Sequence, residues 1–416
     1  QGTRMKSELP KVMHSLAGWP MVRHVAEVAT ALQPALLTVV VGHCEDLVRQ
    51  ALGGQVKYVV QAERLGTAHA TLQAEQVAAG CADTVLVLYG DTPLVRAGTL
   101  RRVVEYHQTE KASVTLLSFY PDDPTGYGRI ERDAADGSVR AIVEEAEASE
   151  RQRAIREANS GILCFRDGWL WPNLHRLDPR PGGELYLTDL VALAREQGEM
   201  IEALPVDDPM EVIGLDQRLR LSQAEGEMRR RINEQWMLSG VTLVHPETTY
   251  IEAGVEIGAD TVVWPNTLLQ GDTCIGRHCS IGPGTVIRDS TICDGCRVEL
   301  SVVEQAIMED GSDVGPFGHL RKGAHLGVGA HVGNFGEIKN STLGAGAKMG
   351  HFSYLGDAEV GAGANIGAGT ITANYDGKTK FKTRIGDGVF IGSGTIIVAP
   401  GEVGDGATTG AGAVVT

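Results

Sequence analysis

The 416-residue sequence has little of what marks membrane, secreted or nucleic-acid-binding proteins. No apolar run approaches the ~18–20 residues that a membrane-spanning helix needs. Bases are outnumbered, 37 against 53 acids, and the formal charge of -16 opposes attraction to a phosphate backbone. The seven cysteines are scattered, and no signal peptide opens the sequence, which favours reduced thiols in a cytoplasm. We therefore predict a cytoplasmic protein without membrane or nucleic-acid partners.

Glycine, by contrast, is abundant and unevenly placed. Of the 53 glycines, 33 lie in residues 241–416, and the chain is too long for one hydrophobic core. The composition predicts a first domain over 1–215, a helical linker over 216–240 and a second domain over 241–416. The opening residues read as the middle of a motif and Thr416 falls within a repeat, so further residues are expected at both ends.

Residues 1–215 alternate short apolar runs with amphipathic segments. The strand-like runs lie at 36–41, 56–60, 84–88 and 114–119, and the helix-like segments at 21–32, 67–79 and 99–107. Such alternation predicts an α/β domain with a Rossmann-like, mostly parallel sheet covered on both faces. Ligands of such sheets bind beyond the carboxyl ends of the strands.

The linker predicts one amphipathic helix, because apolar residues recur at intervals of three and four from Leu221 to Trp236. Its polar side carries Arg229, Arg230 and Arg231. A basic patch for a polyanion competes here with a solvated helix face, and the lack of interleaved aromatic residues favours the solvated face.

Aliphatic residues recur every six positions beyond the linker. The series begins at Ile251, Ile257, Val263, Leu269, Ile275, Ile281 and Ile287, and it returns after an insertion at Ile385, Ile391, Ile397 and Val403. A period of six indicates a parallel β-helix, in which each hexapeptide forms a short strand and three close one triangular coil. Glycine after many of these residues suits the tight turns. The flat sides of about nine stacked coils can be covered by further copies of the chain, so we expect a homotrimer.

Three motifs in the first domain suit a nucleoside triphosphate. A Gly-containing loop carries Arg4 and Lys11, whose cations suit phosphates. The other two motifs are Gln61 to His69, with the sequence QAERLGTAH, and Leu88 to Asp91, with the sequence LYGD. Asp91 follows a strand, where a carboxylate can hold Mg²⁺ against phosphate oxygens, although a helix N-cap is an equal alternative for it alone.

With these motifs the chain resembles the bacterial bifunctional N-acetylglucosamine-1-phosphate uridylyltransferase / glucosamine-1-phosphate N-acetyltransferase family over nearly its whole length. The matching segments are DPTGYGRI at 123–130, IVEE at 142–145, NSGI at 159–162, GNF at 333–335, GH at 350–351, YLGDAE at 354–359, GAGT at 367–370 and NYDG at 374–377. The resemblance implies that the β-helix is left-handed. It also implies acetyl transfer from acetyl-CoA to glucosamine 1-phosphate, then uridylyl transfer from UTP to N-acetylglucosamine 1-phosphate with release of pyrophosphate.

The resemblance assigns roles in the first domain. Arg4 and Lys11 would stabilise the charge of the UTP phosphates and pyrophosphate. The remaining nucleotide and sugar contacts would be Gln61, Gly66 and Thr67 for uracil, Tyr89, and Gly128, Glu144 and Asn159 for N-acetylglucosamine 1-phosphate. Asp91 would hold Mg²⁺ with a second residue, which is Asn in the family and Asp216 here. A second departure is Ala146, where many relatives carry Lys after the paired acids. The chemistry is in-line attack on the α-phosphorus, for which no side-chain base is required.

In the β-helix the resemblance makes His351 the general base that accepts a proton from the glucosamine amine, with Glu337 as its orienting partner. Ser393 would stabilise the oxyanion or contact the thioester. The glucosamine 1-phosphate contacts would be Arg321, Lys339, Tyr354, Asn365 and Lys380, and the acetyl-CoA contacts Ala368, Asn374, Tyr375, Ser393 and Ala411. The insertion over 372–383 is expected to reach a neighbouring subunit.

Two other functions are weighed against this one. The β-helix could serve only to assemble subunits of a sugar-1-phosphate nucleotidyltransferase, but His351 and its surroundings argue against a bare spacer. A hexapeptide zinc lyase would use His319, His325, His331 and His351, but the nucleotide motifs would then have no role. Cys293 and Cys296 have zinc-like spacing without a second suitable pair, so a metal site there is disfavoured.

Overall fold

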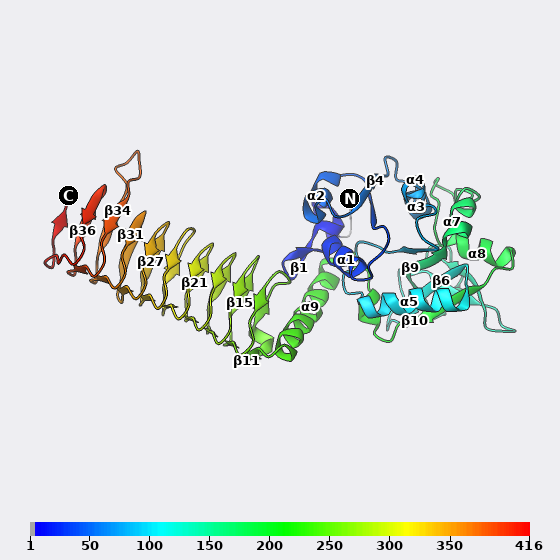
Figure 1. The fold of residues 1–416 in the computed structure, drawn as a ribbon. Helices are drawn as coiled ribbons and strands as arrows, with labels where there is room; N and C mark the ends of the chain where they lie inside the picture. The colour runs from blue at the N-terminus through cyan, green and yellow to red at the C-terminus, as the bar shows by residue number, and fades with distance from the viewer. Residues whose placement is uncertain (1–4) are drawn as a thin grey trace. The chain divides into compact units, whose positions relative to one another are not determined.

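The computed structural model describes residues 5–416, and the chain forms two compact units, Gln1–Ala224 and Glu225–Thr416. The division falls inside helix α9 (Arg218–Leu238), within the segment predicted to be a helical linker. Figure 1 shows the helix-and-strand unit and the repeated coils of the second unit. Over the described residues, no helix combines the length and the apolar character that crossing a membrane requires.

The first unit alternates strands and helices, as predicted. Its helices are α1 (Met21–Thr30), α2 (Glu45–Leu52), α3 (Thr67–Leu72), α4 (Glu75–Ala78), α5 (Ala97–Glu110), α6 (Glu150–Arg153), α7 (Asp167–Leu174) and α8 (Asp189–Glu196), with 3-10 turns at Lys11–Met13 and Pro209–Val212. Its strands are β1 (Ser15–Leu16), β2 (Trp19–Pro20), β3 (Thr38–Val41), β4 (Lys57–Val60), β5 (Thr84–Val87), β6 (Val114–Phe119), β7 (Arg129–Arg132), β8 (Val139–Val143), β9 (Ala158–Arg166) and β10 (Ile201–Pro205). The four predicted strands correspond to β3, β4, β5 and β6.

The α/β fold class is confirmed, but the strand directions are more mixed than expected. Strands β10 and β6 are parallel, as are β3 and β4. Strand β9, however, runs antiparallel to β5, β6 and β7, and β7 forms an antiparallel pair with β8. The sequence prediction missed this because it covered only the strands before residue 120. The β7–β8 hairpin and β9, which follow, enter the sheet without helical crossovers of the β-α-β kind.

The core of this sheet holds a histidine. Strand β6 is buried along its whole length, and α5 packs Leu100, Val103 and His107 inward. His107 is 3% exposed, and its Nδ1 lies 2.9 Å from Thr115 Oγ1. Burial, together with the smaller effect of the Arg166 charge, lowers the pKa of His107 to about 4. The ring is therefore neutral in the folded protein at neutral pH.

We predict that His107 makes the first unit sensitive to acid. Because its folded pKa lies below the ordinary value of 6.5, its contribution is complete above that value and is lost as pH falls toward 4. The full effect is about 3 kcal/mol of unfolding free energy. Urea unfolding of wild type and His107→Gln between pH 7 and pH 4 should give a shallower decline in the variant. Parallel curves would contradict the assignment.

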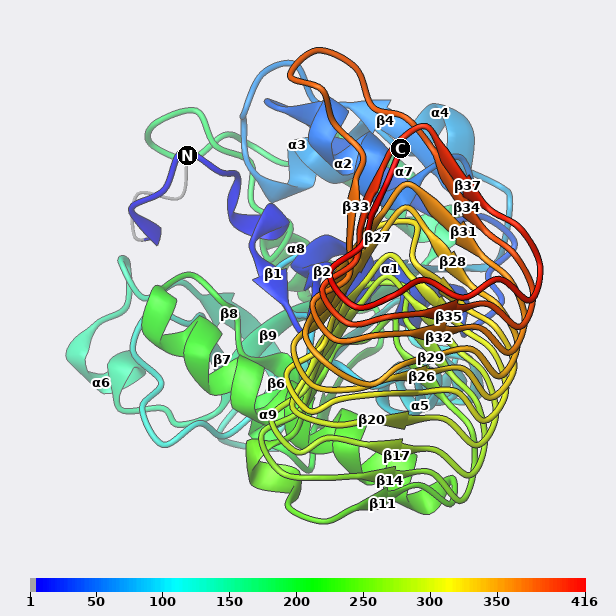
Figure 2. The same ribbon diagram turned by 90° about the vertical axis from the view of Figure 1, so that its left-hand side faces the viewer.

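The second unit is a β-helix. Its short strands form three parallel sheets of nine, ten and nine strands, beginning at β11 (Thr242–Leu243), β12 (Tyr250–Ile251) and β13 (Glu256–Ile257), here called the β11, β12 and β13 sheets. Each strand pairs with the third strand along, such as Ile257 opposite Ile275 in the β13 sheet. The predicted aliphatic positions are buried inside the coils. Figure 2 shows the coils stacked, with β14 (Val262–Val263) and β17 (Ser280–Ile281) on one side and β31 (Ala358–Val360) and β34 (Thr383–Ile385) on another. The predicted left-handed hexapeptide β-helix is confirmed.

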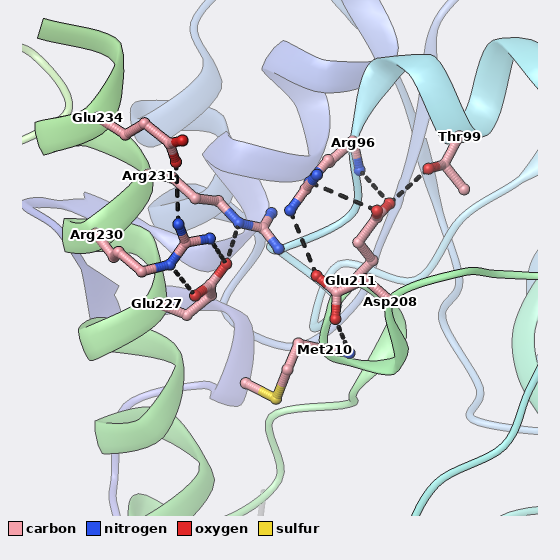
Figure 3. Close-up of polar contacts among 9 residues, drawn as sticks. All are labelled: Arg96, Thr99, Asp208, Met210, Glu211, Glu227, Arg230, Arg231 and Glu234. Atoms are coloured by element: carbon pink, nitrogen blue, oxygen red, sulfur yellow. Dashed lines mark hydrogen bonds and ion pairs between the residues drawn. The ribbon is translucent and has the colours of Figure 1, made fainter. Parts of the chain in front are cut away.

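Two of the three consecutive arginines of α9, Arg230 and Arg231, are paired with acids on the same helix. Arg230 contacts Glu227 and Glu234, and Arg231 contacts Glu227 (Figure 3). These two cations hold the pKa of Glu227 at about 2. Arg229 lies over the Tyr250 ring, 4.3 Å from its centroid. Local pairing of this kind is typical of a salt-bridged helix face rather than of a patch open to a polyanion.

Candidate functional sites

In the first unit, Lys11 of the predicted phosphate-binding loop lies next to Asp91, the first of the two predicted metal ligands. Lys11 lies in the 3-10 turn Lys11–Met13 and forms an ion pair with Asp91, which comes shortly after β5. Leu215 N donates to Asp91 O at 2.9 Å, which brings the turn at 214–216 to the same place. Arg4 lies outside the described residues.

The predicted uracil-binding residues lie at the start of α3. Gly66 precedes this helix with φ +95°, a conformation that side chains rarely adopt, and a Cβ there would collide with the backbone of Leu185. Gln61 Nε2 donates to Gly66 O at 3.1 Å. Thr67 Oγ1 accepts from Leu187 N at 2.9 Å. The loop at 185–187 therefore fixes the Gly66–Thr67 turn.

A methyl group at Gly66 should damage this turn. Gly66→Ala combines a left-handed φ with a clash against backbone, so we expect uridylyl transfer to fall at least ~10-fold in kcat/KM. Acetyl transfer by the same preparation should be unchanged. Gly80→Ala is the matched control, because Gly80 has φ +74° but nothing within 4 Å of the added carbon. Equal losses in both variants would show that strain alone is responsible.

The predicted sugar-phosphate residues also come together. Asn159 N donates to Gly128 O at 2.8 Å, and Asn159 Oδ1 accepts from Gly161 N at 3.0 Å. A Cβ on Gly128 would lie 2.9 Å from Ile142 Cγ2 and 3.5 Å from a Glu144 oxygen, so a side chain there would press on the neighbours of that carboxylate. The Tyr89 ring fills the space where a Gly161 side chain would be, and burial raises the pKa of its phenol to about 12. Tyr89 is thus a neutral hydrogen-bond donor.

Two further residues act on Glu144 and were missed from the sequence. Thr188 Oγ1 donates to Glu144 at 3.0 Å, while burial raises the pKa of Glu144. Arg180 pairs with Glu147 and Asp189, lies over the Tyr186 ring, and its charge lowers the pKa of Glu144 in opposition to burial. Arg180 therefore brings a cation near the pair of acids that precedes Ala146. The segment Leu185-Tyr186-Leu187-Thr188 before α8 is the sequence feature that could have pointed to these two residues.

The turn at 214–216 carries the second predicted metal ligand. Asp216 Oδ1 lies 3.4 Å from Arg220 Nη1, and Arg220 also donates to Tyr127 OH and Gly214 O at 3.1 and 3.3 Å. Burial raises the pKa of Tyr127, with the charges of Asp216 and Asp91 adding to the effect. Both carboxylates therefore act on one phenol. Two carboxylates close to Lys11 fit Mg²⁺, which takes few protein ligands and substrate phosphates.

In the β-helix, His351 lies at one corner, in the turn between β29 (Lys348–Met349) and β30 (Ser353–Gly356). The same corner on successive coils holds three of the predicted acetyl-CoA residues, Ala368, Ser393 and Ala411. Gly369 N donates to Phe352 O, Gly394 N to Ala368 O and Gly412 N to Ser393 O, at 2.7, 2.7 and 2.8 Å. His351, Ala368, Ser393 and Ala411 thus lie in or beside one column along the corner, with His351 and Ser393 exposed.

A charged group lies on the adjoining β12 sheet. Glu337 in β27 (Gly336–Lys339) is in register with Tyr354, and its Oε1 accepts from Arg321 Nη1 at 2.7 Å. Lys339 has its pKa lowered chiefly by Lys380 and then by Arg321, which places three cations together. Within residues 5–416 no hydrogen bond joins Glu337 to His351. The predicted orienting partner is engaged with an arginine instead.

The remaining predicted residues divide between sheets. Asn365 lies in β32 (Asn365–Ile366) of the β11 sheet, beside Lys348, and not on the sheet of Tyr354 and Lys339. Asn374 and Tyr375 belong to the loop between β33 (Ile371–Ala373) and β34, which projects from the coils (Figures 1 and 2, in orange). Asn374 donates to Asp357, and Tyr375 is 59% exposed at a bridge to Lys380.

The rival lyase hypothesis requires histidines that meet between subunits, and within one chain three of them lie on different sheets. His319, His325 and His331 lie on the β12, β13 and β11 sheets, and they pair with Glu304, Glu309 and Asp313. Cys296, of the zinc-like cysteine pair, is buried and donates to Glu309 O at 3.1 Å. These contacts give the three histidines and Cys296 structural partners inside the β-helix.

Fold and sites together define a nucleotidyltransferase unit joined to a hexapeptide-repeat transferase unit. Comparison supports both parts: the MobA-like NTP transferase domain family matches residues 1–162, and the bacterial transferase hexapeptide family matches 254–289. Curated relatives cover the whole chain. The bifunctional proteins GlmU of Shouchella clausii, Latilactobacillus sakei and Brevibacillus brevis are 44%, 44% and 45% identical over 100% of it, and 92%, 90% and 90% of their own lengths are covered.

The chain belongs to the GlmU family. This confirms the family predicted from the motifs, and with it the bifunctional transferase activity in UDP-N-acetylglucosamine synthesis.

Proposed function

We propose that the first unit transfers uridylyl groups through the pocket around Lys11, Asp91 and Glu144. Lys11, with Arg4, would stabilise the triphosphate and the departing pyrophosphate, and the Gly66–Thr67 turn would hold the uracil with Gln61. Gly128, Glu144, Asn159 and the Tyr89 phenol would hold N-acetylglucosamine 1-phosphate. The observation that supports this proposal is the connected set of contacts from Gly66 through Leu185 to Thr188 and Glu144. Positioning and charge neutralisation then carry the reaction.

Asp91 and Asp216 would hold a divalent cation, which we propose to be Mg²⁺. Bound there, the ion supplies positive charge to the triphosphate. Lys11 contributes a further cation beside Asp91.

We also propose a cytoplasmic location, in keeping with seven cysteines that are all free thiols.

The second unit would transfer the acetyl group at the corner that holds His351. His351 would take a proton from the glucosamine amine as it attacks the thioester, and Ser393 would contact the oxyanion or thioester. Arg321, Lys339 and Lys380 form a cationic group suited to the sugar phosphate. Tyr354 would donate to the sugar, while Ala368, Asn374, Tyr375 and Ala411 would contact coenzyme A. Binding of the sugar phosphate would draw Arg321 away from Glu337 and toward the phosphate. Glu337 would then be available to orient His351.

We propose that the acetyl-transfer site is completed between subunits of a homotrimer. Asn365 supports this, because within one chain it lies on a different sheet from the other sugar-phosphate residues. Mixing His351→Ala and Asn365→Ala chains tests the arrangement. If His351 and Asn365 of one site come from different chains, random trimers should regain about a quarter of wild-type acetyl transfer. Failure of the mixture to exceed its parents would place both residues in one chain.

One assay tests both activities. The full chain is incubated with glucosamine 1-phosphate, acetyl-CoA, UTP and Mg²⁺, and the products are followed by mass. We expect N-acetylglucosamine 1-phosphate first, then the UDP-sugar and pyrophosphate. If the UDP-sugar formed only from added N-acetylglucosamine 1-phosphate, the β-helix would be an assembly module alone.

A further inference from the structure

Asp216 forms an ion pair with Arg220, a residue to which the proposed function assigns no role. Asp216 brings a full negative charge to a pocket that already holds Asp91 and Glu144 and must accept a triphosphate. Arg220 lies in the first turn of α9, four residues later, and its Nη1 is 3.4 Å from Asp216 Oδ1. The side chains are 29% and 20% exposed, so the pair is partly shielded from water. Its charges therefore interact more strongly than those of a pair in bulk solvent.

Arg220 also fixes the turn on which Asp216 sits. It donates to Gly214 O at 3.3 Å and to Tyr127 OH at 3.1 Å, and its guanidinium lies 5.4 Å from the centroid of the Tyr127 ring. Leu215, between Gly214 and Asp216, donates its N–H to Asp91 O. One arginine thus holds both ends of the three-residue turn that is tied to the other predicted metal ligand. An ordinary i,i+4 pair on a helix surface has no such connections.

We propose that Arg220 is a charge-compensating and positioning residue of the nucleotide site. It offsets the charge of Asp216 and holds that carboxylate at the turn, so the second carboxylate adds no net negative charge against the triphosphate. This inference rests on the proposed uridylyl-transfer site. Its consequence is that Asp216 and Arg220 act as one unit: losing either shifts the charge of the pocket, and losing both restores it.

The test measures binding of Mn²⁺, used as a probe for Mg²⁺, by electron paramagnetic resonance of the free ion, with and without UTP. Arg220→Gln leaves one extra negative charge and should bind the bare ion roughly 3–10-fold more tightly, and UTP with the ion roughly 3–10-fold more weakly. Asp216→Asn should weaken binding of the bare ion by a similar factor. The double variant has the wild-type charge and should return to within about twofold of wild type for both.

Other outcomes overturn the proposal. A double variant that stays as far from wild type as either single variant, or Arg220→Gln values within about twofold of wild type, would reduce the pair to a structural contact. Arg220→Lys keeps the charge and should resemble wild type; a shift equal to that of Arg220→Gln would also overturn the proposal. If Arg220→Gln does not fold, as judged by melting temperature and by acetyl transfer, the lysine and double variants still decide. Wild type that binds no Mn²⁺ with UTP present would instead refute the proposed uridylyl site.

Discussion

Replacing His351 with alanine should reduce acetyl transfer by ~10²–10⁴-fold, the usual contribution of a positioned general base. Uridylyl transfer by the same chain should stay within about twofold of wild type, because that activity is assigned to residues of the other compact unit, Gln1–Ala224. The reason lies in the corner column: His351 is exposed at a turn whose counterparts on later coils carry Ala368, Ser393 and Ala411. Removing the imidazole takes away the base without disturbing the buried aliphatic positions of the coil.

The measurement is the rate of N-acetylglucosamine 1-phosphate formation from glucosamine 1-phosphate and acetyl-CoA. His278→Ala is a matched control, because His278 is also an exposed histidine in a bend of the β-helix. It should retain wild-type activity. If His351→Ala kept more than about a tenth of the acetyl-transfer rate, His351 would not be the base.

The second large effect is expected for Asp91→Ala, which should slow UDP-sugar formation by roughly 10²–10³-fold. The substitution removes a predicted Mg²⁺ ligand and also the anionic partner of Lys11. Two charges that face the triphosphate are therefore disturbed at once. Acetyl transfer should be unaffected, which makes this variant the converse of His351→Ala.

UDP-sugar formation from UTP and N-acetylglucosamine 1-phosphate is measured at increasing Mg²⁺ concentrations. Asp178→Ala serves as control, because Asp178 is an exposed aspartate of the same unit. If saturating Mg²⁺ fully restored the activity of Asp91→Ala, Asp91 would contribute to affinity for the ion and not to the rate of the chemical step. Loss of both activities from a folded protein would contradict the assignment of two separate sites.

Local patterns were enough to predict much of this protein. The six-residue period predicted the β-helix because each coil needs the same inward aliphatic residue, and Ile257 and Ile275 indeed meet in one sheet. The strands β3 to β6 followed from their apolar runs. The strand directions beyond β6 did not, because whether β9 runs parallel or antiparallel depends on how the chain returns to the sheet. No periodicity in the sequence records that path.

The candidate sites show the same division. Sequence motifs predicted Asp91, Glu144 and His351, because the two reactions require those side chains. The Asp at position 216, where the resemblance implies Asn, was also visible in the sequence. Thr188, Arg180 and Arg220 were not found, because they are polar residues in unremarkable local sequence, and their partners at 144, 147 and 127 are 33 to 93 positions away. The sequence alone thus determined the repeat and the fold class, and it predicted the residues of each site. Only the tertiary structure decided which distant charges face one another, because such pairing depends on distance in space and leaves no spacing rule along the chain.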